Sequence, residues 1–182
     1  MVDVLTPFEP GAVEELKVGD KVGLSGTVYT GRDRTHQRFV ETLEAGGELP
    51  FSPAGQTIFY AGPTGSNRPP GVGSVGPTTA SRLDQYTPAM LDAGIKGMIG
   101  KGSRSPDVIE AIREHRAVYC LAAGGAAAFL SQYVKSARVL AYEELGPEAV
   151  YELVLDRFPL IVAVDSAGRD IFALGPEKFR RA

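Results

Sequence analysis

Apolar and polar residues alternate in the first part of the chain, which is the pattern of a strand with one buried face. The clearest example is residues 21–30, KVGLSGTVYT, in which Val22, Leu24 and Val28 share one side of an extended backbone. We therefore predict a strand here, with these three side chains in the core. The preceding residues 11–19 predict a short helix or a turn.

A helical period replaces this alternation after the strand. Phe39, Val40 and Leu43 recur on one face of a helix. Asp33 precedes them at a position where its side chain can cap the first turn, and the Gly46-Gly47 pair provides a stop. We predict a helix from Asp33 to about Leu43.

Strand and helix patterns then alternate through the middle of the chain. Three short apolar runs predict buried strands, and each is followed by a segment that predicts a helix. The predicted strands are 57–61, 95–99 and 117–123, and the predicted helices are 78–93, 106–116 and 124–134. The segment 62–77 is rich in glycine and proline, and such loops in compact domains often carry binding groups.

Strand patterns return near the C-terminus. We predict a strand at 137–145 and, from Val150 onward, a hairpin that turns around residues 165–170, DSAGRD. Alternation in the middle with strands at both ends is typical of an α/β domain with a mixed sheet and helices. A length of 182 residues suits one such domain, so we expect residues 1–182 to fold together.

The composition is that of an ordinary globular protein, with 43% hydrophobic and 23% charged residues. A net charge of −3 gives no reason to expect nucleic acid or a membrane as a partner. The apolar run 121–130 is too short to span a bilayer, and the N-terminus lacks the layout of a signal peptide, so we expect a cytoplasmic protein. Cys120 is the single cysteine, which excludes an internal disulfide, and its spacing from the two histidines does not suit zinc.

The segment GRDRTHQRF places charged groups at a predicted helix start. Such a segment is commonly only a solvated face. Arg32 at this position, with Asp33 beside it as an orienting partner, can instead bind a carboxylate through two parallel hydrogen bonds. His36 lies one turn further on and can exchange a proton near neutral pH, although a lone histidine is more often structural.

Two further segments carry groups of the same kind. GPTTASR has Thr78 and Thr79 at a predicted helix start and Arg82 one turn later, where a threonine cap and a surface arginine are the simpler interpretation. Lys101 follows a predicted strand between two glycines, where ligands of open α/β sheets gather, although a solvated lysine fits equally well. Together, Arg32, Arg82 and Lys101 can converge on one dianion.

Gly71, Gly73 and Gly76 form a G-x-G-x-x-G pattern within the long loop. A dinucleotide site requires a strand directly before these glycines, and Arg68-Pro69-Pro70 cannot form one. We favour a turn-rich loop that needs positive φ angles. Backbone amides at a helix start that bind a carboxylate are a third interpretation.

Seven stretches, in the same order, resemble the β chains of class I fumarases and L(+)-tartrate dehydratases and the C-terminal domain of the single-chain enzymes. These stretches are GTVYTGRDRTHQR, IFYAGPTG, GSVGPTTASRLDQY, GMIGKGSRS, AVYCLAAGGAAAFL, AYEELGPEAVYEL and FPLIVAVDSAGRD. The resemblance extends from about Leu5 to Leu174, and the combination of GRDxxHxR, GPTTxxR and GKGxR is highly specific.

This resemblance implies a swivelling β/β/α domain and the reversible loss of water from a small hydroxy-dicarboxylate. It also implies a 4Fe-4S cluster bound by three cysteines of a partner α subunit and not by this chain, with an open iron that acts as a Lewis acid on the leaving hydroxyl. We expect a hetero-oligomer of the α2β2 type. Cys120, in an apolar predicted strand, is then a core residue.

The resemblance assigns substrate binding to four residues and catalysis to two. The substrate-binding residues are Arg32, Thr79, Arg82 and Lys101. Thr78 resembles the proposed catalytic base, and His36 matches a histidine taken as an active-site residue in tartrate dehydratase β chains. The cations would hold the carboxylates and stabilise the negative charge on the carbon that loses its proton.

The stretch GKGSRS resembles the fumarase version of the family more than the glycine-rich tartrate dehydratase version. We therefore expect malate and fumarate as the substrate pair, with the conversion of tartrate to oxaloacetate as the alternative. A non-catalytic docking or regulatory module is the alternative of another class, and the intact set of site residues argues against it.

Overall fold

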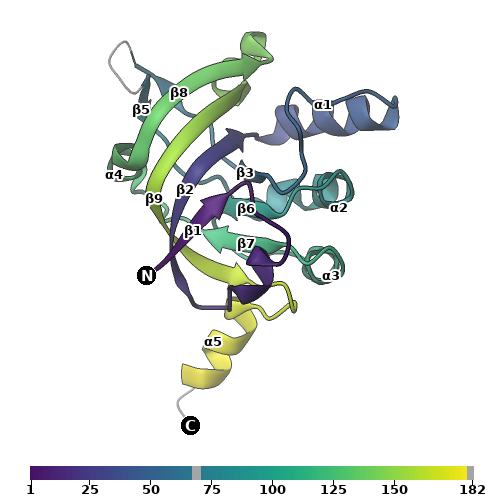
Figure 1. The fold of residues 1–182 in the computed structure, drawn as a ribbon, viewed down its shortest axis with the longest axis vertical. Helices are drawn as coiled ribbons and strands as arrows, with labels where there is room; N and C mark the ends of the chain where they lie inside the picture. The colour runs from purple at the N-terminus through teal and green to yellow at the C-terminus, as the bar shows by residue number, and fades with distance from the viewer. Residues whose placement is uncertain (67–70, 180–182) are drawn as a thin grey trace.

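A seven-stranded mixed sheet forms the centre of the protein (Figure 1). The computed structural model describes residues 1–66 and 71–179, in which the strand order is β1-β2-β3-β6-β7-β9-β8. The strands of this sheet are β1 (Val2–Thr6), β2 (Lys21–Thr30), β3 (Thr57–Phe59), β6 (Gly97–Gly100), β7 (Val118–Leu121), β8 (Val134–Ala141) and β9 (Val150–Val164). A separate two-stranded ribbon consists of β4 (Thr64–Gly65) and β5 (Val72–Ser74).

The sheet closes into a ring because β9, with 15 residues, is long enough to pair along both of its edges. One edge of β9 pairs antiparallel with β2, from Ile161 opposite Lys21 to Glu152 opposite Tyr29. The other edge pairs antiparallel with β8 and then with β7. As a result, β2, β3, β6, β7 and β9 form a five-stranded ring in which the first four strands are parallel.

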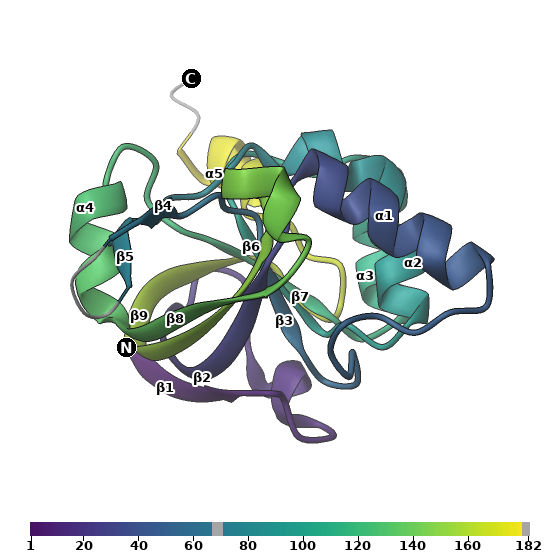
Figure 2. The same ribbon diagram turned by 90° about the horizontal axis from the view of Figure 1, so that it is seen from above.

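Helices cover one flank of this ring, as two perpendicular views show (Figure 1, Figure 2). On that flank α1, α2 and α3 lie next to one another, outside β3, β6 and β7, while α4 lies beside the β4–β5 ribbon on the opposite side. The α-helices are α1 (Asp33–Glu44), α2 (Thr87–Asp92), α3 (Pro106–Glu114), α4 (Ala127–Leu130) and α5 (Ile171–Phe179). The 3₁₀ helices are η1 (Ala12–Glu15), η2 (Ala80–Tyr86), η3 (Ser131–Tyr133) and η4 (Glu143–Glu148).

The strands that lie under the helices are buried on both faces, which explains their nearly continuous apolar sequences. Phe59 packs inside the ring, while its neighbours Ile58 and Tyr60 pack against the helices. The same alternation places Cys120 inside and Tyr119 outside. The prediction that Cys120 is a core residue is confirmed, and burial raises the pKa of its thiol to about 12.

Much of the predicted framework is confirmed. The strand at 21–30 is β2, with Val22, Leu24 and Val28 buried, and the short helix expected within 11–19 is η1. The three buried strands in the middle of the chain are β3, β6 and β7, and the alternating pattern forms a mixed α/β domain.

The hairpin predicted around residues 165–170 is confirmed only as a turn with one antiparallel bridge, between Val164 and Asp170, because a helix follows the turn. The Asp165 carboxylate closes the turn by accepting the backbone N–H groups of Ala167 at 3.0 Å and Arg169 at 3.2 Å. Asp170 then accepts the N–H of Phe172 at 3.0 Å, which is the geometry of a helix N-cap. The chain therefore continues into α5 and not into a returning strand.

Four other predicted elements differ from the structure, and one of them, the helix at 124–134, is α4 followed by η3. Residues 78–93 do not form one α-helix, because Pro88 lacks the N–H that would continue the ladder, and η2 gives way to α2 at that point. The strand predicted at 137–145 ends at Ala141, since Tyr142 has a φ of 58° and η4 follows. The long segment 62–77 contains the β4–β5 ribbon.

The glycine pattern within that segment does not have the layout of a dinucleotide site. Gly71 has a positive φ of 91°, Gly73 lies inside β5, and η2 begins only at Ala80. Arg68-Pro69-Pro70 lie outside the described residues. Within residues 1–66 and 71–179, no helix has the length and apolar composition needed to cross a membrane.

Candidate active site

The carboxyl ends of three parallel strands meet at one edge of the ring, and the predicted site residues lie in the segments that leave it. Arg32 follows the end of β2 by two residues, and Lys101 directly follows β6. Thr78 reaches the end of β3, where its N–H donates to the carbonyl of Tyr60 at 2.6 Å. Ligands of α/β sheets bind at such an edge because the loops diverge there.

Backbone hydrogen bonds hold the Thr78 segment against Lys101. The Lys101 N–H donates to the Thr78 carbonyl at 3.1 Å, and the Ala80 N–H donates to the Lys101 carbonyl at 2.8 Å. Thr79 is the N-cap residue of η2, but its side chain makes no capping hydrogen bond. Thr78 is partly buried, whereas Thr79 and Lys101 are exposed on adjacent segments.

A glutamate from far along the chain binds the start of α1. Glu148 Oε2 accepts the N–H of Arg34 at 2.9 Å, and the Glu148 carbonyl accepts the hydroxyl of Thr35. Glu148 Oε1 also lies 3.9 Å from Arg32 Nη2. Glu148 therefore caps the N-terminus of α1 from a distant part of the chain. The prediction that Asp33 caps this helix is wrong, because Asp33 is its first helical residue.

Asp33 does not orient Arg32 as predicted, because its carboxylate binds Arg82. The distances are 3.1 Å from Arg82 Nε to Oδ1 and 2.8 Å from Nη2 to Oδ2. This pair holds η2 against the start of α1 and places the half-exposed Arg82 guanidinium near the Arg32 segment. Arg32 Nε is buried with no hydrogen-bond partner among the described residues, so this donor is unsatisfied there.

His36 lies behind Arg32 and not at the surface, with a side chain that is buried among the rings of Phe39, Tyr60 and Tyr86. Its Nδ1 is 2.9 Å from the carbonyl oxygen of Arg32, so Nδ1 must carry the proton and donate it. Burial lowers the pKa of His36 to about 4, which leaves the imidazole neutral at pH 7. Its Nε2 has no hydrogen-bond partner in the described part of the chain. The proton-transfer role of His36 stays a prediction.

The sequence did not single out two carboxylates that organise the site. Glu148 binds the start of α1, and Asp84 joins η2 to the loop after Lys101 by accepting the N–H of Ser105 at 2.8 Å. Each acts on a segment distant in sequence, and neither stands in a local pattern that distinguishes it from the other acidic residues.

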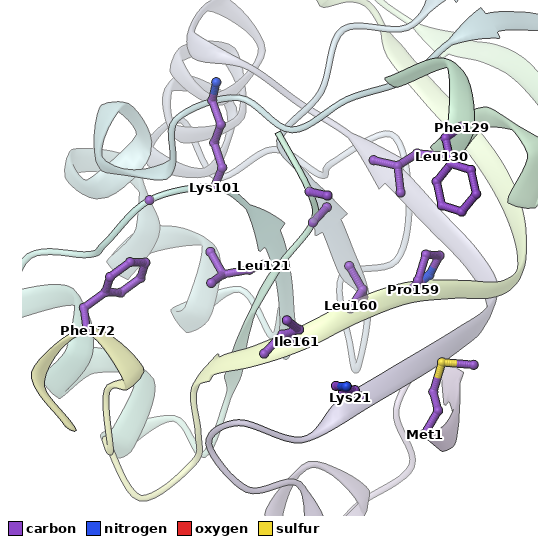
Figure 3. Close-up of a pocket in the computed structure, with 13 residues that line it drawn as sticks. Met1, Lys21, Lys101, Leu121, Phe129, Leu130, Pro159, Leu160, Ile161 and Phe172 are labelled. Carbon is purple, nitrogen blue, oxygen red and sulfur yellow. The ribbon is translucent and has the colours of Figure 1, made fainter. Parts of the chain in front are cut away.

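Lys101 also borders an apolar hollow of about 570 Å³ (Figure 3). Leu121 and Leu160 line this hollow, together with the exposed rings of Phe129 and Phe172. In the close-up, the Lys101 side chain points away from these apolar groups (Figure 3). The hollow thus adjoins the edge of the ring that carries the candidate site.

An iron–sulfur cluster is held by several thiolates, and the sequence contains one cysteine. This cysteine, Cys120, is buried inside the ring, where it pairs with Ile99 near the carboxyl end of β7. Within the described residues, no group of three or more His, Cys, Asp or Glu side chains is placed to bind a metal ion.

Similarity to known proteins extends along almost the whole chain. It is 37% identical over 175 residues to "Fumarate hydratase class I, anaerobic" of Escherichia coli strain K12, a match that covers 94% of this chain and 32% of that protein. It is 36% identical over 179 residues to "Fumarate hydratase 1, mitochondrial" of Leishmania major, again with 94% and 32% coverage. The chain thus spans about a third of the length of these relatives.

A relative of similar length is the Methanocaldococcus jannaschii protein provisionally named L(+)-tartrate dehydratase subunit beta. The two are 39% identical over 166 residues, which cover 88% of this chain and 85% of that protein. The model of the fumarase C-terminus matches residues 1–175. The chain therefore belongs to the fumarase C-terminus family.

Proposed function

We propose that this chain is the β subunit of a hydro-lyase that interconverts (S)-malate and fumarate plus water. The supporting observation is that Arg32, Arg82 and Lys101 leave three different segments at one edge of the ring, with Thr78 between them in the backbone network. Three cations from separate segments suit a ligand with two carboxylates. Relatives that match almost the whole chain are named as fumarate hydratases.

Each residue has its own task in the proposed reaction. Arg32 and Arg82 hold the carboxylates through paired N–H donors, and the Asp33 carboxylate fixes the plane of the Arg82 guanidinium. Lys101 adds a positive charge that stabilises the negative charge on the substrate as its carbon-bound proton leaves. Thr78 accepts that proton as its alkoxide and becomes the neutral hydroxyl. A hydroxyl is a poor base, and the charges of Arg82 and Lys101 favour its ionised form.

We assign the 4Fe-4S cluster to a partner α subunit, since this chain has only one cysteine. We place that partner over the hollow beside Lys101, because the substrate has to contact both subunits. The charged residues that line the hollow are Lys21 and Lys101. An apolar partner surface flanked by carboxylates would complement it, within an assembly of the α2β2 type.

L(+)-tartrate is a second candidate substrate, with oxaloacetate as its product. It is supported by the similarity over most of its length to the M. jannaschii protein provisionally named as a tartrate dehydratase subunit. Tartrate and malate are both hydroxy-dicarboxylates, so the same arginine contacts serve either one.

The test is co-expression with the α subunit, anaerobic purification, and assays with malate, fumarate and tartrate. We expect the complex to be active, and the isolated chain to be folded, colourless and inert because it lacks the thiolates for a cluster. Rapid hydration of fumarate by the isolated, iron-free chain would refute the assignment of the cluster to the α subunit. A well-formed complex that is inert towards all three compounds would refute the catalytic function and favour a docking module.

A further inference from the structure

One buried arginine lies within the framework of the candidate site. The Arg104 side chain is completely buried. Its Nε donates to Asp84 Oδ1 at 2.7 Å, its Nη1 donates to the Tyr60 hydroxyl at 3.2 Å, and its Nη2 donates to the Thr87 hydroxyl at 2.5 Å. The guanidinium carbon also lies 5.4 Å from the ring centre of Tyr60 and 5.0 Å from that of Tyr119, within the range of cation–π contact.

These partners belong to the segments that carry the site residues. Asp84 lies on η2, two residues beyond Arg82. Tyr60 accepts the backbone N–H of Thr78 through its carbonyl oxygen. Arg104 itself is the third residue after Lys101. One guanidinium therefore joins the Arg82 helix, the Thr78 segment and the Lys101 loop.

Two backbone contacts tie the Lys101 loop to the same network. The Ser105 N–H donates to Asp84 Oδ2 at 2.8 Å, and the Tyr119 hydroxyl donates to the Gly102 carbonyl at 2.8 Å. Without the guanidinium, the largely buried Asp84 carboxylate would lose its ion pair and keep the hydrogen bond from the Ser105 N–H. An unpaired buried charge is strongly unfavourable, so the segments would shift to let water reach it.

We propose that Arg104 is a positioning residue that sets the separation of Arg82 and Lys101, so that both cations reach one dianion. The ligand in this inference rests on the proposed function, whereas the joining of the segments rests on the contacts of Arg104 alone. Lysine cannot substitute, because it lacks the planar set of donors that reaches Asp84, Tyr60 and Thr87 together and stacks over two rings.

The test compares Arg104→Lys, Arg104→Met and Asp84→Asn with the wild-type chain. Arg113→Lys is the matched control, since Arg113 is an exposed arginine of α3 that pairs only with Glu110 in the described structure. Amide hydrogen exchange of the labelled chain, followed by NMR, reports on the hydrogen bonds between Thr78, Ala80 and Lys101. We expect the Ala80 and Lys101 amides to exchange about tenfold faster in the variants, with sheet amides such as those of β7 little changed.

Kinetics of the reconstituted complex give the second measurement. We expect KM for malate and fumarate to rise about tenfold in Arg104→Lys and kcat to fall as well, because the carboxylate contact of Arg82 and the charge of Lys101 are both displaced. Wild-type exchange at both amides together with wild-type KM would overturn the proposal. Uniformly faster exchange with a lower melting temperature and an unchanged KM would also overturn it, as the sign of a purely structural role.

Two further outcomes are covered by the same design. If Arg104→Met does not fold, Arg104→Lys and Asp84→Asn decide the question, because each keeps most of the side-chain volume. If the wild-type complex is inert towards all dicarboxylates, the proposed function fails. The exchange rates at Ala80 and Lys101 then still decide whether Arg104 joins the segments.

Discussion

Replacing His36 with asparagine should remove a large part of the acid sensitivity of this fold. Burial lowers the pKa of His36 from 6.5 to about 4, so the folded protein keeps the imidazole neutral where the unfolded chain binds a proton. The unfolded state therefore gains protons first as the pH falls. The contribution to stability is complete above pH 6.5 and is lost progressively as the pH decreases towards 4.

The expected magnitude follows from this pKa difference. One pKa unit corresponds to about 1.4 kcal/mol, so the full interval corresponds to about 3 kcal/mol, of which about 2 kcal/mol is lost by pH 5. A single domain has a free energy of unfolding of only about 5–15 kcal/mol, so this loss is measurable. Asparagine does not titrate, yet it keeps an N–H donor close to the position of Nδ1, which binds the Arg32 carbonyl.

Urea unfolding, followed by far-UV circular dichroism at pH 7 and pH 5, measures the effect. His115→Asn is the matched control, because His115 is the other histidine of the chain and lies partly exposed beside Asp92. The surroundings of Asp165, whose pKa is lowered by hydrogen bonds from Arg169 and from backbone N–H groups, are the same in all three proteins, so the difference between the wild type and His36→Asn reports on His36. Equal losses of stability in the wild type and in His36→Asn would refute the reasoning.

The remaining predictions concern kinetics of the reconstituted complex. Arg32→Lys and Arg82→Lys should each lower kcat/KM about ten- to a hundredfold, since lysine cannot rebuild a paired carboxylate contact worth about 1.5–3 kcal/mol, while Arg34→Lys serves as the exposed neighbouring control. Unchanged kinetics in both variants would place these arginines outside the site. Thr78→Ala should lower kcat about a hundredfold or more with substrate binding largely kept, and Thr78→Ser should retain appreciable turnover. An active, mildly destabilised Thr78→Ala enzyme would assign the proton transfer to another residue, with His36 the next candidate.

The order of apolar and polar residues was sufficient to predict the strands and helices that are buried on one face or on both faces. The period-two alternation of Val22, Leu24 and Val28 identifies β2 because a strand turns every second side chain to the same face. Local pattern predicted the turn around DSAGRD but not the helix after it, because Asp170 was interpreted as part of a hairpin turn. An aspartate suits both a turn and a helix cap, and only the segment that follows separates the two.

The candidate site likewise depends partly on the sequence and partly on the tertiary structure. The sequence by itself predicted which residues belong to it, through the motifs around Arg32, Thr78 and Lys101 and their places after predicted strands. The tertiary structure alone decided how charged groups pair: Asp33 with Arg82 across 49 residues, and the Glu148 carboxylate with the start of α1 across 114.

The protonation of His36 was decided in the same way, because its pKa depends on burial by side chains from several segments. Helix and strand periods are set by neighbours within a few residues, so a sequence displays them directly. Ion pairs and desolvation depend on distance in space, which chain closure brings about only after the elements have packed.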